Sequence, residues 1–391
     1  MPANTLINFF LLPELKFIRS EGVSRIFCQK SSELEVCPKC ATPSRTVYDH
    51  RWVKIKDEPI KQALPVLVIL KRRFFCKTCK KPFTEPVPGI LPGRRTTQRF
   101  KLAILNACEK YRSMKLVRDE FGVSSDFVYR ARYEQLELRA RKHQYQNYPK
   151  TLGLDEHGIG KCPQFGTKRF VTMIVDQKAR RLIEVAEGKK TEDVKQALAH
   201  LNHPENVAWV TQDMYEGYRK FVYENLPHAR IIIDKFHVLR LLSPALLRER
   251  KRIAGTNANR KARRLLLMSS KKLDYFDRLA ISRYLEQYPT LKELYEFKEM
   301  LHSFYRIKNP RQAINAMDAI IITAAMAQTK EVKTLGKTLQ NWKKEICNYF
   351  DQRITNARLE GFNRKASLVR MQAYGYKNVN NYRLQLLSAC S

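Results

Sequence analysis

Thr151-Leu152-Gly153-Leu154-Asp155 is the first of five short apolar runs whose order decides the fold of this chain. Two helical patterns separate the last three of these runs, whereas the first three follow one another directly. Three strands, then helix, strand, helix and strand, indicate a mixed sheet in which an antiparallel meander is extended by parallel strands. The later strand candidates are Phe170–Val175, Arg181–Val185, Val207–Thr211 and Arg230–Ile233, and the helix candidates are Thr191–Leu201 and Tyr215–Leu226.

This order of elements predicts an α/β fold with a ribonuclease-H-like core, and it brings acids to the ends of strands. Asp155 ends the first strand, and Asp213 follows the fourth. A buried carboxylate is costly unless it is paired or bound to a metal, and functional residues of α/β sheets gather at the carboxyl ends of strands. Asp234 follows the fifth strand in the same way. These physical arguments alone do not choose between Asp213 and Asp234.

A third acid, Glu360, lies far downstream in the segment Ile354–Lys365, which is rich in basic and amide side chains. We expect this acid to lie on a helix that packs across the two strand ends. Asp155, Asp213 and Glu360 could then hold two Mg²⁺ or Mn²⁺ ions about 3.5–4 Å apart, as enzymes that cut phosphodiesters do. Hard oxygen ligands suit Mg²⁺ rather than zinc. The flanking Arg358 and Arg364 are predicted to contact DNA.

The overall charge of the chain favours a nucleic-acid partner. Its 391 residues include 73 Lys and Arg against 38 Asp and Glu, a net charge of +35. Such an excess opposes compaction unless a polyanion is a regular partner. A cationic membrane-surface protein is the competing class, but the sequence has no long uncharged apolar run and no lipidation motif. No secretory signal is recognisable at the N-terminus, so we expect a cytoplasmic protein on DNA.

Four of the nine cysteines form two closely spaced pairs. The motifs Cys37-Pro38-Lys39-Cys40 and Cys76-Lys77-Thr78-Cys79 are separated by a β-rich segment. Two such turns can complete a tetrahedral Zn²⁺ site, and four thiolates leave no open coordination position. The pairs therefore predict a structural zinc ion, in preference to a redox pair or two unrelated buried pairs. Cys28 has no partner by spacing and is expected in the core.

A basic helical segment follows the cysteine pairs. Residues 113–123 read as a short helix that ends at a Gly turn, and Ser124 then caps a further helix. A helix, a glycine turn and a capped basic helix are typical of a helix-turn-helix, although a plain helical hairpin has the same pattern. The residues expected to meet DNA are Ser125, Tyr129, Arg130 and Arg132.

The chain is long enough for several domains. We predict a zinc-binding domain at 1–92 and a helix-turn-helix at 93–147. The core would occupy 148–240 and 346–391, with an all-helical insertion at 241–345 between them. The insertion follows from the distance between Asp213 and Glu360, which is far longer than one strand-to-helix connection needs. The basic start of the insertion is expected to contact the DNA backbone; it includes Arg248, Arg250, Lys251, Arg252, Arg260, Lys261, Arg263 and Arg264.

Several strings in this chain together resemble the DDE transposases of the ISL-three group of bacterial insertion sequences. Any one string is modestly specific, whereas their order and spacing are highly specific. The resemblance runs nearly end to end, since that family also carries an N-terminal domain with paired CxxC motifs followed by a helix-turn-helix. The strings are Leu152–Glu156, Asp213–Tyr215, Asp234–Val238, Asn356–Gly361 and Ala373–Leu384.

The resemblance implies Asp155, Asp213 and Glu360 as the catalytic triad, with Asp234 and His237 in a supporting role. It also implies binding of terminal inverted repeats and target DNA, metal-dependent strand cleavage and strand transfer, and a homodimer or larger assembly that holds two DNA ends. Two alternatives remain open from the sequence. One is a DNA-binding regulator with an inert core, and the other is a metal-dependent nuclease that never joins strands.

Overall fold

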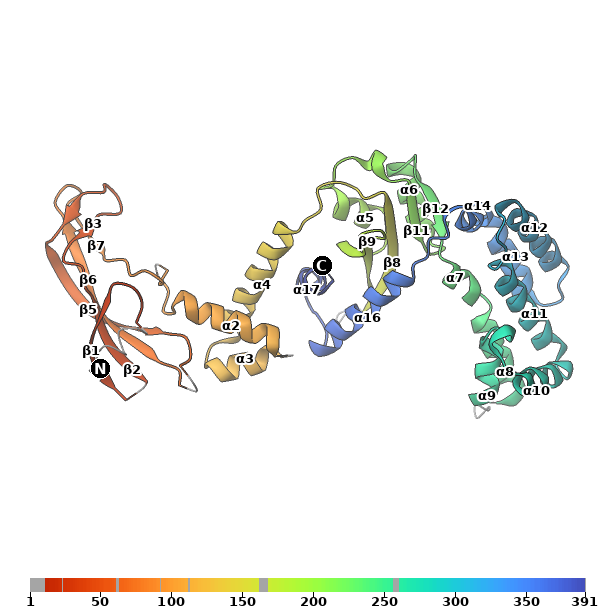
Figure 1. Cartoon of the computed structure of the whole chain (residues 1–391), viewed down its shortest axis with the longest axis horizontal. Coiled ribbons are helices and arrows are strands. Elements are labelled where there is room, and N and C mark those ends of the chain that lie inside the picture. Colours follow the sequence, from red (N-terminus) through yellow and green to blue (C-terminus); the bar gives the residue numbers. More distant parts are fainter. Residues whose placement is uncertain are drawn as a thin grey trace. The chain divides into compact units, whose positions relative to one another are not determined.

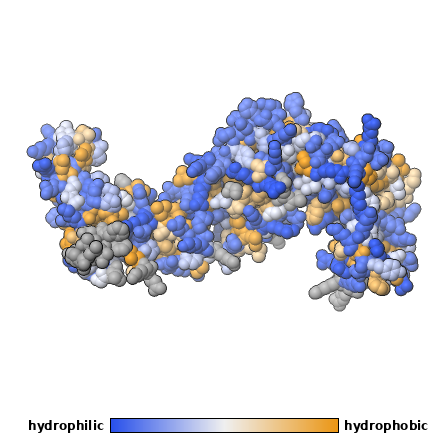
Figure 2. Space-filling model, viewed as in Figure 1, coloured by the Kyte–Doolittle hydropathy of each residue, from blue (hydrophilic) through white to orange (hydrophobic). Residues whose placement is uncertain are grey.

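The computed structural model describes residues 11–22, 24–60, 63–91, 93–111, 113–161, 168–255 and 260–390. The chain divides into two compact units, Met1–Glu137 and Leu138–Ser391 (Figure 1). Within the described residues, no helix is both long and apolar enough to span a membrane. Hydrophilic residues cover most of the face seen in Figure 2, with smaller hydrophobic areas between them. This surface agrees with the high proportion of Lys and Arg in the sequence.

The N-terminal unit contains a five-stranded sheet with β6 at its centre. The strand order is β1-β2-β6-β5, and β7 pairs with β6 beyond the end of β2. The β2–β6 pair is parallel and the other pairs are antiparallel. Cys28 on β2 and Ile69 on β6 are both fully buried, so the expectation that Cys28 is a core residue is confirmed. The strands are β1 (Leu15–Glu21), β2 (Arg25–Lys30), β5 (Val47–Lys56), β6 (Val66–Cys76) and β7 (Lys81–Thr84).

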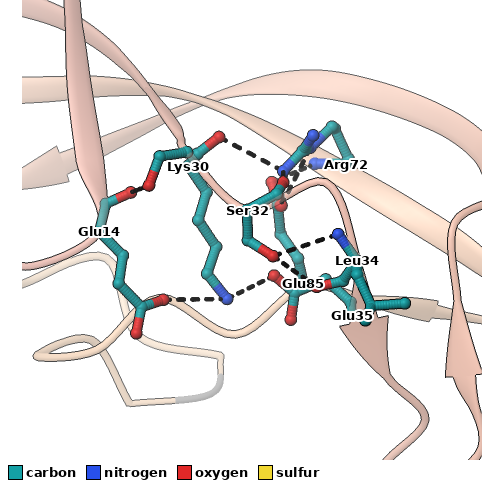
Figure 3. A network of polar contacts seen from close by, with 8 residues as sticks. Glu14, Lys30, Ser32, Leu34, Glu35, Arg72 and Glu85 are labelled. Carbon is teal, nitrogen blue, oxygen red and sulfur yellow. Dashed lines mark hydrogen bonds and ion pairs between the residues drawn. The ribbon is translucent and has the colours of Figure 1, made fainter.

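Buried ion pairs tie this sheet to the segment that leads into the first cysteine pair (Figure 3). Arg72 on β6 donates to Glu85, with 2.8 Å between Nη2 and Oε2, and the Glu85 side chain is fully buried. The same Nη2 donates to the backbone oxygen of Ser32 at 2.6 Å. Lys30 at the end of β2 pairs with Glu35, and both side chains are buried. Because a buried charge is tolerated only when it is paired, these contacts fix the path of the chain before Cys37.

Three helices follow the sheet: α2 (Gln98–Lys110), α3 (Met114–Phe121) and α4 (Ser125–Lys142). Helix α3 ends at Gly122, whose φ of 56° lies in the left-handed region that favours glycine. The hydroxyl of Ser124 accepts a hydrogen bond from the N–H of Phe127 at 3.2 Å and so caps the start of α4. The predicted helix, glycine turn and capped helix are therefore present. The shared core consists of Phe100, Ile104, Ala107, Val117, Phe121 and Val128.

The C-terminal unit is built on a second five-stranded sheet, with strand order β10-β9-β8-β11-β12. The β8–β9 and β9–β10 pairs are antiparallel. The β8–β11 and β11–β12 pairs are parallel. An antiparallel meander extended by parallel strands is what the order of apolar runs predicted. The strands are β8 (Thr151–Lys161), β9 (Lys168–Asp176), β10 (Arg181–Glu187), β11 (Trp209–Gln212) and β12 (Arg230–Ile233).

Helices cover both faces of this sheet, and the alternation of side chains along β8 decides which residue meets which helix. Leu152 and Leu154 belong to the core that includes side chains of α5 and α6. Side chains of α16 and α17 pack on the other face, against a separate core that includes Met173. Asp155 alternates with the two leucines and so lies on the side of α16. The helices are α5 (Thr191–Leu198), α6 (Glu216–Asn225), α16 (Ala357–Gln372) and α17 (Val379–Ala389).

The segment between β12 and α16 contains helices and connecting loops throughout its described residues, as the long separation of Asp213 and Glu360 predicted. Arg219 on α6 ties the end of this segment to the sheet layer. Its Nη2 donates to Glu345 at 2.8 Å, and its guanidinium lies 3.9 Å from the centre of the Trp342 ring. The helices are α7 (Lys235–Arg240), α8 (Ser243–Ala254), α9 (Arg260–Leu267), α10 (Tyr275–Glu286), α11 (Pro289–Phe304), α12 (Pro310–Met326), α13 (Lys330–Asn341), α14 (Lys343–Cys347) and α15 (Tyr349–Gln352).

Candidate zinc centre and candidate active site

The four paired cysteines lie together in the N-terminal unit. Cys37 and Cys40 occupy the turn between the short strands β3 (Glu35–Val36) and β4 (Pro43–Ser44), and Cys76 and Cys79 lie at the turn between β6 and β7. All four sulfurs lie within 4.8 Å of one another, with 3.5 Å between the Cys40 and Cys76 Sγ atoms. Four sulfurs bound to one zinc ion lie about 3.8 Å apart. The spacing therefore fits a tetrahedral zinc site.

The electrostatics of the cluster point the same way. Hydrogen bonding with Thr42 lowers the pKa of the Cys40 thiol to about 6. The neighbouring Cys40 raises the pKa of Cys79 to about 12. Four thiolates this close together repel one another, and a divalent cation relieves that repulsion. Because four thiolates would leave no position of a tetrahedral site open, a zinc ion held here would stabilise the fold and would take no part in bond breaking.

Helix α16 lies along β8 and is aligned with it by contacts at both ends. Near the start of α16, Leu359 packs against Gly153: a Cβ added to this glycine would lie only 2.9 Å from the Leu359 Cδ1 atom. Near the other end, Arg370 Nη1 donates to the backbone oxygen of Gly158 at 3.2 Å. Gly153 thus allows the close approach of helix and strand that sets the position of the intervening residues of α16.

Asp155 lies between these two contacts and is held by hydrogen bonds on both carboxylate oxygens. Its Oδ1 accepts from the backbone N–H of Glu156 at 2.9 Å. Its Oδ2 accepts from Nδ2 of Asn363, on α16, at 2.8 Å. The residue is only 7% exposed, and burial raises the pKa of the Asp155 carboxyl above its ordinary value.

Asp213 follows β11, the parallel neighbour of β8, and Asp234 follows β12, the next strand of the sheet. Burial, together with the nearby charge on Asp155, raises the pKa of the Asp213 carboxyl to about 6. Burial likewise raises the pKa of Asp234. The nearby His237 side chain opposes these shifts, since its protonated form lowers the pKa of all three aspartates. The three acids and His237 therefore form one electrostatically linked group at the edge of the sheet.

Glu360 is the predicted acid that does not join this group. Its side chain is about half exposed and pairs with Arg364 on the next turn of α16, with 2.9 Å between Oε1 and Nη2. Across the described residues, the acids form no group of three whose carboxylate oxygens all lie within 4.8 Å of one another. Glu360 nonetheless lies on the helix that contacts Asp155, one turn before Asn363.

Asp234 anchors the start of α16. Its Oδ1 accepts a hydrogen bond at 3.2 Å from the backbone N–H of Asn356, the residue that precedes the helix. The Asn356 side-chain oxygen in turn accepts from Nε2 of Gln177 at 2.8 Å. The same Nε2 donates to Thr211 on β11 at 2.9 Å. The residue expected in a supporting role thus connects β12 to the helix that carries Glu360.

The aspartates fit a divalent cation. Oδ1 of Asp213 is buried and has no hydrogen-bond partner. A buried carboxylate oxygen without a partner is costly unless a proton or a cation neutralises it. Carboxylate oxygens are also the ligands that Mg²⁺ and Mn²⁺ prefer. The donor set at this edge of the sheet is therefore that of a hard divalent cation.

The residues predicted to bind DNA divide into exposed and buried side chains. Ser125 and Arg130 are exposed near the start of α4, and Tyr129 is 48% exposed. The prediction is wrong for Arg132, which is 5% exposed. Its Nη1 donates to Glu109 on α2 at 2.5 Å, so it holds two helices together instead of facing solvent.

The predicted DNA contacts in the C-terminal unit divide in the same way. The Arg364 side chain is 78% exposed, whereas the side chain of Arg358 lies outside the described part of the structure. Arg250, expected to contact the DNA backbone, is 5% exposed. Lys261 and Arg264 pair with Asp277, at 3.0 Å and 2.7 Å. Part of the basic charge at the start of the insertion therefore serves packing and pairing within it.

Two residues of the site were missed from the sequence. Asn363 lies three positions after Glu360, and this helical spacing could have drawn attention to it. Lys189 follows β10, and its Nζ lies 2.9 Å from an oxygen of Glu156. Its charge lowers the pKa of Asp213. No local pattern marks Lys189, because only the sheet topology brings the end of β10 to the acids.

Comparisons with known proteins agree with this arrangement. A family model of ISL3 DDE transposases, described as a transposase, matches residues 152–386. A second model, described as the zinc-finger of transposase IS204/IS1001/IS1096/IS1165, matches residues 33–79 and so includes all four paired cysteines. The transposase for insertion sequence element IS1001 of Bordetella parapertussis is 21% identical over 376 residues, which cover 93% of this chain and 91% of that protein.

The matched segments contain the zinc cluster and the strands and helix that carry Asp155, Asp213 and Glu360. The transposase match alone spans more than half of the residues in the chain. The resemblance noted from the sequence strings is thus confirmed. The chain belongs to the ISL3 family of insertion-sequence transposases.

Proposed function

We propose that this transposase binds the terminal inverted repeats of its insertion sequence and then cuts and joins DNA strands by a DDE mechanism. In this proposal Asp155, Asp213 and Glu360 hold two divalent cations. One observation carries it: Asp155 and Asp213, on and just after neighbouring parallel strands, are buried and half-buried respectively, and both have raised pKa values. In addition, one oxygen of Asp213 has no partner. Such a site is poised to take up cations, since their charge replaces the missing hydrogen bonds.

The fold of the C-terminal unit supports the proposal. Its strand order, with an antiparallel meander followed by two parallel strands, is the order expected of a ribonuclease-H-like core. The last acid lies on a helix that returns to the first strand after a long helical insertion. This arrangement accounts for acids so far apart in the sequence belonging to one site.

The protein's own side chains prepare the site for DNA. Bound Mg²⁺ or Mn²⁺ would activate the attacking oxygen and stabilise the leaving oxygen. Asn363 holds the carboxylate of Asp155, and Asp234 holds the start of α16. When DNA enters, the Glu360 side chain leaves its ion pair with Arg364 and turns towards the cation site. An exposed helical pair of this kind contributes only about 0.3–0.5 kcal/mol, so the exchange costs little. The released guanidinium of Arg364 is then available to a phosphate.

DNA recognition is assigned to the N-terminal unit. Helices α3 and α4 form a helix-turn-helix in this proposal, with Ser125, Tyr129 and Arg130 exposed near the start of α4. The zinc cluster gives the preceding sheet a fixed surface for further contacts. Since transposition needs two element ends in one complex, we propose a homodimer or larger assembly on DNA.

A cleavage and joining assay tests the proposed function. Element-end DNA is incubated with Mg²⁺ and the wild-type chain, Asp155→Asn, Asp213→Asn or Glu360→Gln. Each variant should lose at least about 100-fold in strand cleavage, because charge that stabilises the transition state is removed. Glu224→Gln, which alters an exposed acid on α6, should cut like the wild type.

Two results would contradict the proposal. Unchanged cleavage by all three site variants would remove the catalytic assignment and favour a DNA-binding regulator. Pre-cut ends that are never joined to target DNA by the wild-type chain would indicate a nuclease without strand transfer.

A further inference from the structure

Asn363 is the uncharged side chain that connects α16 to the aspartates. It donates from Nδ2 to Oδ2 of Asp155 at 2.8 Å. The opposite assignment of its amide would direct an oxygen at a carboxylate oxygen, so this orientation is the one that makes a hydrogen bond. The amide is therefore fixed with its nitrogen towards Asp155 and its oxygen directed elsewhere.

The oxygen of this amide has no hydrogen-bond donor. Oδ1 of Asn363 is buried and without a partner, as is Oδ1 of Asp213. A buried amide oxygen without a hydrogen bond destabilises the folded protein. The cost is acceptable where a ligand supplies the missing interaction. Both orphaned atoms are oxygens: Asp213 follows β11, and Asn363 lies on α16, the helix that contacts Asp155. An oxygen acceptor is satisfied by a cation or by a hydrogen-bond donor.

We propose that Asn363 belongs to the cation site: its Nδ2 positions the carboxylate of Asp155, and its Oδ1 is an oxygen ligand of the divalent cation held there. This inference rests on the proposed function and adds a neutral ligand to the three acids. An amide supplies both interactions from one side chain, whereas a fourth acid could not donate to Asp155. Mg²⁺ and Mn²⁺ accept amide oxygens together with carboxylates.

Cation binding without DNA tests the role of Asn363. Mn²⁺ binding to the zinc-loaded, full-length protein is measured by the electron paramagnetic resonance of free Mn²⁺. Asn363→Leu keeps the volume of the side chain but removes both polar atoms. It should raise the Mn²⁺ dissociation constant about 10–100-fold, the usual cost of losing a residue that orients a metal ligand. Asn363→Asp restores an oxygen at the same position but not the donor to Asp155, so it should recover part of the affinity that the leucine variant loses.

The controls separate a ligand from a packing residue. Asn380→Leu, at an exposed position on α17, should bind Mn²⁺ like the wild type. Thermal unfolding of each variant without Mn²⁺ shows whether it folds. If Asn363→Leu does not fold, Asn363→Ala replaces it, with the same expected rise in the Mn²⁺ dissociation constant. Wild-type affinity in Asn363→Leu, or equally weak binding in Asn363→Asp and Asn363→Leu, would overturn the assignment.

Asp155→Asn and Asp213→Asn separate failure of this inference from failure of the proposed function. If both bind Mn²⁺ as the wild type does, the cation site itself is wrong. If both lose Mn²⁺ while Asn363→Leu retains it, only the role of Asn363 is wrong.

Discussion

The zinc cluster and the acid site are both groups of metal-ligating side chains, but they are assembled to different degrees. The four cysteine sulfurs lie within 4.8 Å of one another. In the acid site Asp155 is close enough to raise the pKa of Asp213, whereas Glu360 remains paired with Arg364. The cysteine site, which serves the fold, is already assembled in the protein alone. In the acid site, which is proposed to serve catalysis, Glu360 joins the aspartates only when substrate binds.

The difference has a physical cause. Each C-x-x-C turn delivers two ligands from one tight turn, and a residue with positive φ follows each pair: Ala41 with φ of 57° and Lys80 with φ of 52°. The acids come from the middle of β8, the end of β11 and a distant helix, and desolvation disfavours the charged forms of the two aspartates. The cluster therefore stabilises the protein when zinc binds, whereas the acid site destabilises it until cations and DNA are bound.

The largest expected effect concerns the zinc cluster. Cys76→Ser removes a ligand that also ends the central strand β6, so the protein should lose its zinc ion and several kcal/mol of stability in the N-terminal unit. Zinc content by mass spectrometry and limited proteolysis of residues 33–79 measure these outcomes. Cys347→Ser, in the C-terminal unit, should retain zinc. A zinc-free but protease-resistant Cys76→Ser protein would show that the cluster is not what holds this unit together.

The next effect concerns the contact between α16 and β8. In Gly153→Ala the new methyl group would lie 2.5 Å from Gln177 Nε2 and 2.9 Å from Leu359 Cδ1. The helix must shift, so we expect a loss of about 1–3 kcal/mol in the free energy of unfolding and a matching loss of cleavage. Gly361→Ala on the same helix meets nothing within 4 Å. It should be neutral or stabilising by up to about 1 kcal/mol. Equal stability of the two variants would contradict the close packing of α16 on β8.

Replacing Asp213 by an uncharged residue is expected to increase the free energy of unfolding. The Asp213 folded-state pKa of about 6 lies above the ordinary value of 3.8, so between these pH values the folded state binds more protons than the unfolded state. Stability contributed by this group therefore falls as the pH rises through that range. Asp213→Asn removes the penalty and should stabilise the protein at pH 8 by about 2 kcal/mol while abolishing cleavage.

Chemical unfolding at several pH values checks this prediction. The gain should shrink as the pH falls from 6 towards 4 and disappear where the aspartate is protonated in both states. A variant that is less stable than the wild type at pH 8 would mean that Asp213 is satisfied in the free protein, as a structural residue would be.

The smallest effect is expected at the pair that holds Glu360 away from the aspartates. Arg364→Ala should change the free energy of unfolding without DNA by only about 0.3–0.5 kcal/mol, and high salt should abolish even that difference. Lys220→Ala, which breaks an exposed pair at the same helical spacing, provides the comparison. A loss well above 1 kcal/mol for Arg364→Ala would mean that Glu360 is firmly held and cannot be exchanged readily.

The sequence predicts the zinc cluster better than the acid site, because the ligands of the first come from local motifs and those of the second come from distant elements. The cysteine motifs contain their own geometry, and the alternation of strands and helices determines the order of the second sheet. Asp213 follows from its position after the end of β11. Asp155 is predicted at the end of a strand, but it lies within β8, which continues to Lys161. The burial of Arg132 could not be predicted, because its partner Glu109 lies on another helix and only the packing of α2 on α4 joins them. The side chain of Glu360 can either pair with Arg364 or point towards the aspartates. Composition and spacing do not predict which of these conformations the free protein adopts.

Mn²⁺ anomalous scattering from crystals of the protein bound to element-end DNA tests the central claim most directly. We predict Mn²⁺ peaks bonded to carboxylate oxygens of Asp155, Asp213 and Glu360, with Arg364 released from Glu360. Peaks absent from the two aspartates, or a Glu360 still paired with Arg364 beside an occupied site, would contradict the account.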